Sequence, residues 1–198
     1  MSGRNFSSFA VGGFTIIPAG EPTPHSSSFP LFFGKKGAFG SGEHETTASC
    51  LEIIPAIPSI RGCRALDLGS GTGILALAAA RLGAATVVAV DLEWSAAISC
   101  SENVRLNGFE NCIISVCGDL GCIDRSPFDL IMANIYIDIL LPLADDLVML
   151  TRPGGHLLLS GIPLQDKFDI VVRYTSLGCS VVDSRIGEDY ATYLMKAS

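Results

Sequence analysis

The 198-residue sequence lacks the features that mark several classes of protein. No stretch of about 18 apolar residues is free of charge, glycine and proline, as a membrane-spanning helix requires. Gly12 and Gly13 interrupt the apolar run after Arg4, so no signal peptide is expected. Repeats and low-complexity tracts are absent, and 48% of the residues are hydrophobic, which excludes a disordered, coiled-coil or collagen-like chain. The length predicts one folded core.

Positive charge is scarce and scattered. The chain has 13 Lys and Arg against 20 Asp and Glu, a net charge of −7, and Lys35-Lys36 is its only adjacent basic pair. Binding to nucleic acid phosphates needs clustered basic side chains. We therefore expect no direct contact with nucleic acid.

The seven cysteines lack the spacing of a metal site or of a disulfide framework. Their number is odd, no CxxC occurs, and the closest pairs are five residues apart. Several lie in apolar runs such as Cys112-Ile113-Ile114, where a cysteine packs as a small hydrophobic residue. We expect no bound metal and a reducing, cytoplasmic location.

Residues 1–36 differ from the rest of the chain and predict an N-terminal β-hairpin or arm. They are rich in Ser, Gly, Pro and Phe. Two short β-like runs, Phe14–Ile17 and Phe29–Phe33, flank the turn-forming segment from Pro18 to Pro24. Residues 37–198 are then expected to form the functional domain.

From residue 62 onward, strand and helix patterns alternate, which predicts an α/β fold. The expected helices are Glu43–Ile54, Ile74–Leu82, Trp94–Leu106, Ile137–Leu150 and Pro163–Leu177. The expected strands are Arg64–Leu68, Thr86–Val90, Cys112–Val116, Phe128–Ala133, His156–Ser160, Ser180–Ile186 and Ala191–Lys196. The last two strands are joined by the short connection Gly187-Glu-Asp with no helix between them, so they must form an antiparallel hairpin. The prediction is a doubly wound, Rossmann-like sheet of seven strands with an antiparallel last strand.

The sharpest local signal is the glycine-rich turn Gly69-Ser-Gly71-Thr-Gly73 between a strand and a helix. Glycines allow a tight turn there and a close approach of a ligand to the backbone. Asp91 ends the next expected strand, where a carboxylate accepts hydrogen bonds from the hydroxyls of a ribose. The turn and Asp91 together predict a site for a nucleoside-containing cofactor.

Two cofactor classes compete for this turn. The run from Gly71 to Ala76 fits the G-x-G-x-x-A fingerprint of nicotinamide dinucleotide enzymes. Three side chains favour S-adenosylmethionine instead. Asp67 precedes the first glycine and can hold the amino group of the ligand indirectly, Asp119 follows the third strand and can accept from an adenine amino group, and Asn134 ends the fourth strand at the point where the strand order reverses.

These residues resemble the ribosomal protein L11 methyltransferase family. The resemblance rests on Ala38-Phe-Gly-Ser-Gly-Glu-His-Glu-Thr-Thr47, on the glycine-rich turn, and on Val90-Asp-Leu92, Ala133-Asn-Ile135, Pro153-Gly-Gly and Leu159-Ser-Gly-Ile162. It covers the chain from about residue 14 to its C-terminus. The Phe-Gly-x-Gly-x-His-x-Thr-Thr segment is its most specific part.

The resemblance implies an enzyme that transfers methyl groups from S-adenosylmethionine to protein amines, ribosomal protein L11 among them. The cofactor contacts it implies, together with those expected from the residues themselves, are Phe39, Thr47, Asp67, Gly69, Gly71, Gly73, Asp91, Leu92, Asp119, Leu120 and Asn134. Asn134 is expected to orient the acceptor amine and Tyr136 to close over it. Phe39 is expected to face the sulfonium as a cation–π partner. His44 has two possible roles, a catalytic base or a loop-fixing hydrogen-bond partner.

Two departures from the family pattern leave the acceptor open. Full-length family members carry an N-terminal recognition domain, whereas 37 residues precede Ala38 here, and Gly187-Glu-Asp-Tyr190 stands where the family tends to have a Trp after Gly-Glu. Three alternatives therefore stand beside a protein amine methyltransferase: a small-molecule amine methyltransferase, a cofactor-binding subunit that needs a partner, and a nicotinamide oxidoreductase.

Overall fold

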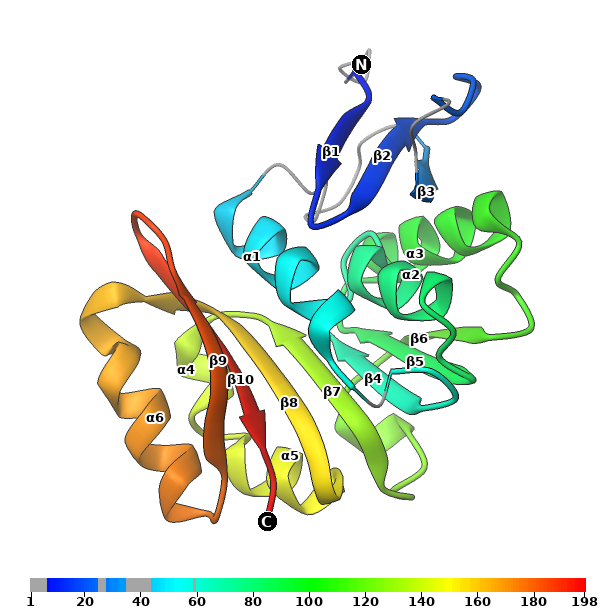
Figure 1. The fold of residues 1–198 in the computed structure, drawn as a ribbon. Helices are drawn as coiled ribbons and strands as arrows, with labels where there is room; N and C mark the ends of the chain where they lie inside the picture. Colours follow the sequence, from blue (N-terminus) through cyan, green and yellow to red (C-terminus); the bar gives the residue numbers. More distant parts are fainter. Residues whose placement is uncertain (1–6, 25–27, 35–43, 59) are drawn as a thin grey trace.

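The structure is a computed structural model that describes residues 7–24, 28–34, 44–58 and 60–198 (Figure 1). Its larger sheet has seven strands in the order β6-β5-β4-β7-β8-β10-β9. The strands are β4 (Arg64–Leu68), β5 (Thr86–Asp91), β6 (Ile113–Cys117), β7 (Phe128–Asn134), β8 (Thr151–Pro163), β9 (Ser180–Ile186) and β10 (Tyr190–Lys196). The five strands from β4 to β8 pair in parallel, and β10 runs antiparallel to both β8 and β9. The predicted seven-stranded, doubly wound sheet is confirmed.

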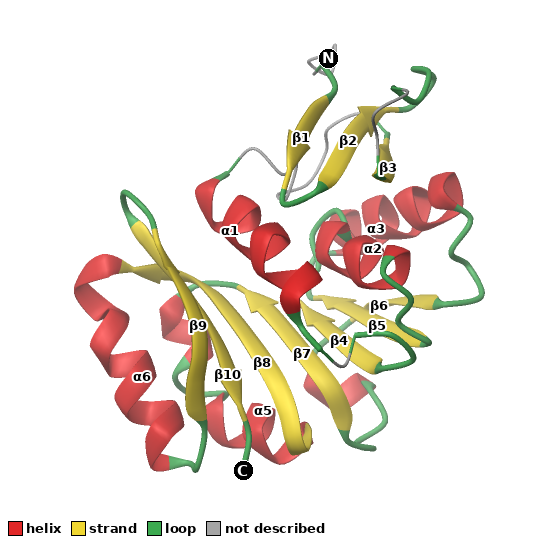
Figure 2. Ribbon diagram, in the orientation of Figure 1, coloured by secondary structure: helices red, strands yellow, loops and turns green. Residues whose placement is uncertain are grey.

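Helices cover both faces of this sheet (Figure 2). One face carries α1 (Glu45–Ile53), α2 (Ile74–Arg81) and α3 (Trp94–Asn107), and the other carries α4 (Ile137–Leu140), α5 (Ala144–Leu150) and α6 (Lys167–Ser176). Alternate residues of each strand enter two separate apolar clusters, as with Ala65 and Leu66 of β4. Burial on both faces explains why the central strands lack a polar alternation in the sequence.

A second, three-stranded sheet is formed by β1 (Phe9–Val11), β2 (Phe14–Pro18) and β3 (Phe29–Phe33). An N-terminal hairpin exists, as predicted, but β1 and β2 form it through Gly12-Gly13, both at positive φ. The two predicted strands instead pair in parallel, with Phe14 opposite Phe29. Ten residues separate Pro18 from Phe29, which is too many for the two-residue turn of a tight hairpin. A connection of this length allows the two strands to run in the same direction.

The small sheet packs on the α1–α3 face of the large one. Phe14, Ile16 and Leu31 are fully buried in the same apolar cluster as Leu51 of α1. A side chain at Gly12 would place its Cβ 2.1 Å from the carbonyl oxygen of Leu51, so only glycine fits where the β1–β2 turn meets this helix.

Two asparagines on one face of α3 bind the backbone of β3. The Asn107 side chain accepts from the N–H of Phe32 at 2.9 Å and donates to its carbonyl oxygen at 2.7 Å, as a neighbouring strand would. Asn103 accepts from the N–H of Gly34 and donates to the carbonyl oxygen of Thr72 in the glycine-rich turn. The amide of Asn103 therefore connects the small sheet directly to that turn.

The largest differences from the predicted boundaries lie between residues 137 and 167. The helix expected over 137–150 is divided into α4 and α5, because Pro142 lacks the N–H that a continuous helix needs. Strand β8 begins at Thr151 and passes through Pro153-Gly-Gly, where Gly154 and Gly155 exchange backbone hydrogen bonds with Ala197. Because β8 extends to Pro163, the last helix begins at Lys167 and not at Pro163 as predicted.

Helix α1 begins at Glu45, with His44 as its N-cap, and Glu43 lies outside the described residues. Within the described part of the chain, no helix is long and apolar enough to cross a membrane.

Replacing Asn107 by Ala is expected to lower the free energy of unfolding by about 1–3 kcal/mol, because the N–H and carbonyl of Phe32 lose their partners. Urea unfolding followed by circular dichroism measures the change. Asn111→Ala, at an exposed position just beyond the same helix, is the matched control. Equal stability of the two variants would show that Asn107 does not anchor β3.

Candidate functional site

The strand order reverses between β4 and β7, and the predicted site residues lie at the carboxyl ends of the strands there. Leu68 of β4 is opposite both Val90 of β5 and Ala133 of β7. The glycine-rich turn, Asp91 and Asn134 directly follow or end these aligned strands. A reversal of this kind opens a crevice at the carboxyl edge, where ligands bind in open α/β sheets.

The glycine-rich turn needs its glycines for conformation and for space. Gly69, Gly71 and Gly73 have φ angles of +71°, +54° and +80°. A Cβ on Gly69 would lie 2.3 Å from Cγ2 of Ile135, and one on Gly73 would lie 2.6 Å from Sγ of Cys100. The turn is therefore packed between helix α3 and Ile135, which follows β7. Asn134, the last residue of β7, directly precedes Ile135 in the sequence and so lies close to the turn.

Asp91 fixes the turn with its side chain. Its carboxylate accepts from the N–H of Gly71 at 2.8 Å and from the N–H of Glu93 at 2.9 Å. A carboxylate has about four acceptor positions, so about two remain at this half-exposed residue for further donors. The arrangement fits the two hydroxyls of a ribose. The predicted cofactor contact at Asp91 stays a prediction with a compatible geometry.

Asp67 lies beneath the turn and not at its surface. Its side chain is buried and accepts from the N–H of Ala76 in the first turn of α2 at 3.0 Å. Burial raises the pKa of Asp67 to about 7, the hydrogen bond from Ala76 opposes that shift, and the nearby Asp91 adds to it. The indirect role of Asp67 toward a ligand stays a prediction.

The ends of β5 and β6 carry the residues predicted to contact an adenine. Asp119 is exposed and caps a 3-10 turn, accepting from the N–H of Gly121 at 2.8 Å. Leu92 is 72% exposed, whereas the side chain of Leu120 is packed into the core. Leu92 offers an apolar surface and Asp119 offers acceptor atoms, two properties that an adenine ring requires of its site; both predicted contacts stay predictions.

Thr47 and Asn134, 87 residues apart in sequence, meet in the structure. Nδ2 of Asn134 donates to Oγ1 of Thr47 at 3.3 Å, and Thr47 is fully buried in α1. The bond uses the amide nitrogen of Asn134, so Oδ1 is the atom that remains for another donor.

Sequence reasoning did not single out a supporting role for Gly161. A Cβ there would lie 2.6 Å from the carbonyl oxygen of Ile135 and 3.4 Å from Oδ1 of Asn134, and its φ is +80°. The only signal was a glycine inside an apolar run, which often marks a close approach of two backbones.

The remaining predicted residues are placed as follows. Tyr136 is the N-cap of α4, two residues after Asn134. Its side chain is 76% exposed and is not packed in the core. His44 caps α1, with its Nδ1 accepting from the N–H of Thr46 and lying 2.9 Å from the Thr46 hydroxyl, which is the loop-fixing role of the two considered. Phe39 lies outside the described residues.

A family model described as "Ribosomal protein L11 methyltransferase (PrmA)" matches residues 3–197. The chain belongs to the ribosomal protein L11 methyltransferase family. A relative of that name from Exiguobacterium sp. is 34% identical over 184 residues, which cover 92% of this chain and 58% of the relative. The chain thus spans a little over half the length of that curated relative.

Solved structures share the fold of this chain. A ribosomal protein L11 methylase from Lactobacillus delbrueckii subsp. bulgaricus superposes with a TM-score of 0.81 at 25% identity, covering 93% of this chain and 94% of that one. A 16S rRNA N2 G1207 methyltransferase of T. thermophilus, solved with AdoMet and guanosine, shares the fold with a TM-score of 0.64 at 21% identity, covering 83% of this chain and 46% of that one.

Asp67→Asn tests the buried carboxyl. Because the folded-state pKa of Asp67 is raised, its protonated form stabilises the fold below about pH 4, and that contribution is lost as the pH rises toward 7. As the pH rises over this range, the free energy of unfolding of the asparagine variant should therefore increase relative to that of the wild type, by on the order of 4 kcal/mol in total. Urea unfolding from pH 4 to 8 measures it. Asp169→Asn, on the exposed face of α6, is the control, and a difference that does not vary with pH would contradict the prediction.

Proposed function

We propose that this chain transfers methyl groups from S-adenosylmethionine to an amine of a protein. The observation that carries the proposal is the contact between Gly69 of the glycine-rich turn and Ile135, which sets Asn134 beside a nucleoside-type turn in a member of the L11 methyltransferase family. Asn134 supplies an oriented amide oxygen at the point where a cofactor bound on the turn would end.

The residues of the turn and of the neighbouring strand ends would hold the cofactor. S-adenosylmethionine, when bound, supplies an electrophilic methyl group on a sulfonium. Asp91 binds the ribose hydroxyls, while Asp119 and the exposed Leu92 receive the adenine. The start of α1, including Thr47, accepts the carboxylate of the methionine part. Phe39, Leu120 and the other predicted contacts complete this proposed set.

Asn134 prepares the acceptor in this mechanism. An amine of reference pKa near 10.4 must lose a proton before its lone pair can attack, and a site shielded from water favours the neutral form. Oδ1 of Asn134 accepts a hydrogen from the amine, so the lone pair points toward the methyl group. Holding donor and acceptor in an attack-ready geometry is the main contribution a protein makes to such a displacement. Tyr136, exposed at the rim, covers the acceptor.

The proposed acceptor is ribosomal protein L11, and the proposed location is the cytoplasm. The family model and the curated relatives bear this substrate in their names, which is the support for it. We further propose the division of the chain into an arm, residues 1–36, and a methyltransferase domain, residues 37–198.

Incubation of the purified chain with methyl-labelled S-adenosylmethionine and L11, and separately with a cell lysate, tests the proposal. We expect one labelled protein band that co-migrates with L11. A label found only in small molecules would replace the protein acceptor by a metabolite. Calorimetry that detects NAD but no S-adenosylhomocysteine would overturn the proposal altogether.

Asp91→Ala should weaken the binding of S-adenosylhomocysteine at least tenfold, because each charge-assisted hydrogen bond to the ribose contributes roughly 1.5–3 kcal/mol. Isothermal titration calorimetry measures the dissociation constant. Asp169→Ala removes the same charge from exposed α6 and should leave the affinity unchanged. Unchanged affinity in Asp91→Ala would mean that the ribose lies elsewhere.

Asn134→Ala should lower kcat by about 100-fold while changing the affinity for S-adenosylhomocysteine much less, because the amide oxygen acts on the acceptor and in the transition state. Steady-state methyl transfer and calorimetry on the same preparation separate the two effects. A wild-type rate in this variant would remove Asn134 from the mechanism.

A further inference from the structure

Two buried hydroxyls join the C-terminal strands to α1. Oγ of Ser160, near the end of β8, lies 2.6 Å from Oγ1 of Thr192 on β10 and donates to the carbonyl oxygen of Thr46 at 3.2 Å. Ser160 is fully buried and Thr192 almost so. Hydroxyls are costly to bury unless they are hydrogen-bonded, so this pair is maintained only while α1 stays in place.

The same strands hold α1 at two further points. The carboxylate of Glu45 accepts from the N–H of Tyr190, the first residue of β10, at 3.0 Å, and a Cβ at Gly187 would meet that carboxylate at 1.8 Å. A side chain at residue 187 would therefore require the Glu45 carboxylate to move from this position.

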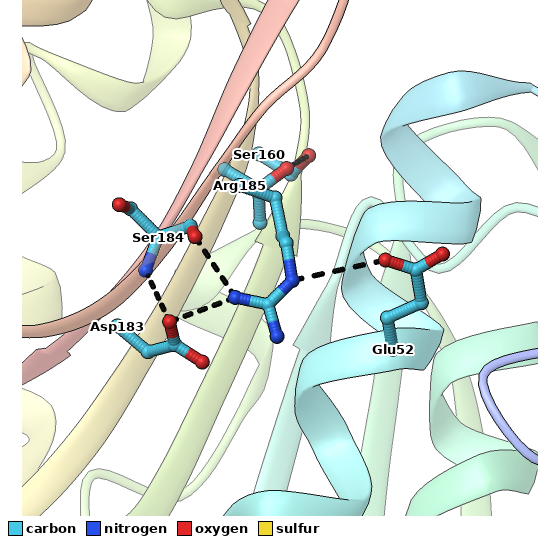
Figure 3. A network of polar contacts seen from close by, with 6 residues as sticks. Glu52, Ser160, Asp183, Ser184 and Arg185 are labelled. Atoms are coloured by element: carbon cyan, nitrogen blue, oxygen red, sulfur yellow. Dashed lines mark hydrogen bonds and ion pairs between the residues drawn. The ribbon is translucent and has the colours of Figure 1, made fainter.

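At the other end of the helix, Figure 3 shows Arg185 of β9 extending toward Glu52. Its Nε lies 3.7 Å from the Glu52 carboxylate, and its guanidinium also donates to Asp183 at 2.8 Å. Arg185 is opposite Thr192 in the β9–β10 pairing. The β9–β10 hairpin thus contacts both the first and the last turn of α1. Thr192 of this hairpin is in turn hydrogen-bonded to Ser160 of β8.

The Ser160 bond is coupled by position to the site. Asn134 and Ser160 are paired residues at the ends of neighbouring strands β7 and β8. They bind consecutive residues of α1, Ser160 through Thr46 and Asn134 through Thr47. A movement of the first turn of α1 relative to β8 would therefore change the distance between the Thr47 hydroxyl and the Asn134 amide.

We propose that Ser160 is a positioning residue for methyl transfer. Its hydroxyl, held by Thr192, fixes the first turn of α1, and Thr47 on that turn fixes the amide plane of Asn134 so that Oδ1 faces the acceptor amine. This inference rests on the proposed function and adds to it a pair of residues that touch neither cofactor nor acceptor. Through Thr192, the C-terminal hairpin would help to hold Asn134 in the orientation that methyl transfer requires.

Ser160→Ala is the direct test, and Thr151→Val is its matched control. Thr151 lies at the opposite end of the same strand, is also buried, and donates to the carbonyl oxygen of Leu147 at 2.7 Å. Its substitution also removes one buried hydrogen bond, but far from the site. Thr192→Val, nearly the same size as threonine, is the second variant and keeps the test open if Ser160→Ala fails to fold.

Two readouts are taken on each variant. The first is methyl transfer: Ser160→Ala should lower kcat about tenfold, with S-adenosylhomocysteine affinity within about threefold of wild type, whereas Thr151→Val keeps the wild-type kcat. The second needs no turnover and is the side-chain amide resonance of Asn134 in ¹H–¹⁵N spectra, assigned by its loss in Asn134→Ala. It should shift or broaden in Ser160→Ala and Thr192→Val and stay in place in Thr151→Val.

The outcomes separate this inference from the proposed function. If the wild-type chain transfers no methyl group, the proposed function fails, and the Asn134 resonance alone decides whether Ser160 positions the amide. If the wild type is active but the resonance is unmoved in Ser160→Ala, the positioning role is overturned. Equal kcat in Ser160→Ala and Thr151→Val overturns it as well.

Discussion

The parallel pairing of β4 with both β5 and β7 is the constraint on which the candidate site depends. Because Leu68 is opposite Val90 on one side and Ala133 on the other, three strands end at the same level. The residues that follow them are brought together at the carboxyl edge of the sheet, where such a reversal opens a crevice, although they are far apart in sequence. A shift of one residue in either pairing would turn each strand's buried side chains to the wrong face, so the two apolar clusters also preserve the site.

Two segments at opposite ends of the chain converge on this crevice. The small N-terminal sheet is bound to α3 by Asn103 and Asn107, and Asn103 also bonds to Thr72 in the glycine-rich turn. The C-terminal hairpin is bound to α1 through Glu45 and Arg185. Neither segment supplies a predicted cofactor contact in the described residues. Each instead holds an element that does, the turn in one case and the start of α1 in the other.

Some of the buried polar side chains lie near the candidate site, whereas Thr151 lies at the opposite end of β8. Asp67, Ser160 and Thr192 all lie close behind the carboxyl edge of the sheet, and each is hydrogen-bonded to another element. Such groups cost stability unless their partners are held precisely, and a satisfied network makes its surroundings rigid. A reaction that depends on the alignment of donor and acceptor benefits from that rigidity more than from extra binding contacts.

The sequence by itself determined the architecture and the position of the cofactor turn. Strand and helix periodicities are local signals, a short connection forces the last two strands antiparallel, and positive φ at the tight turn requires glycine, so these features could be predicted residue by residue. The family resemblance likewise brought Thr47 and Asn134 into one proposed site, and the structure shows them in contact.

Tertiary structure alone decided the pairings between distant segments. The parallel pairing of β2 with β3, the strand-like role of Asn107, the close approach at Gly161 and the bond from Ser160 to Thr46 leave no periodic trace, because each depends on which surfaces meet after the chain has folded. His44 illustrates the same limit. Its residue type fitted both a base and a helix cap; the geometry around the N–H of Thr46 shows the cap, and a role as a base stays untested.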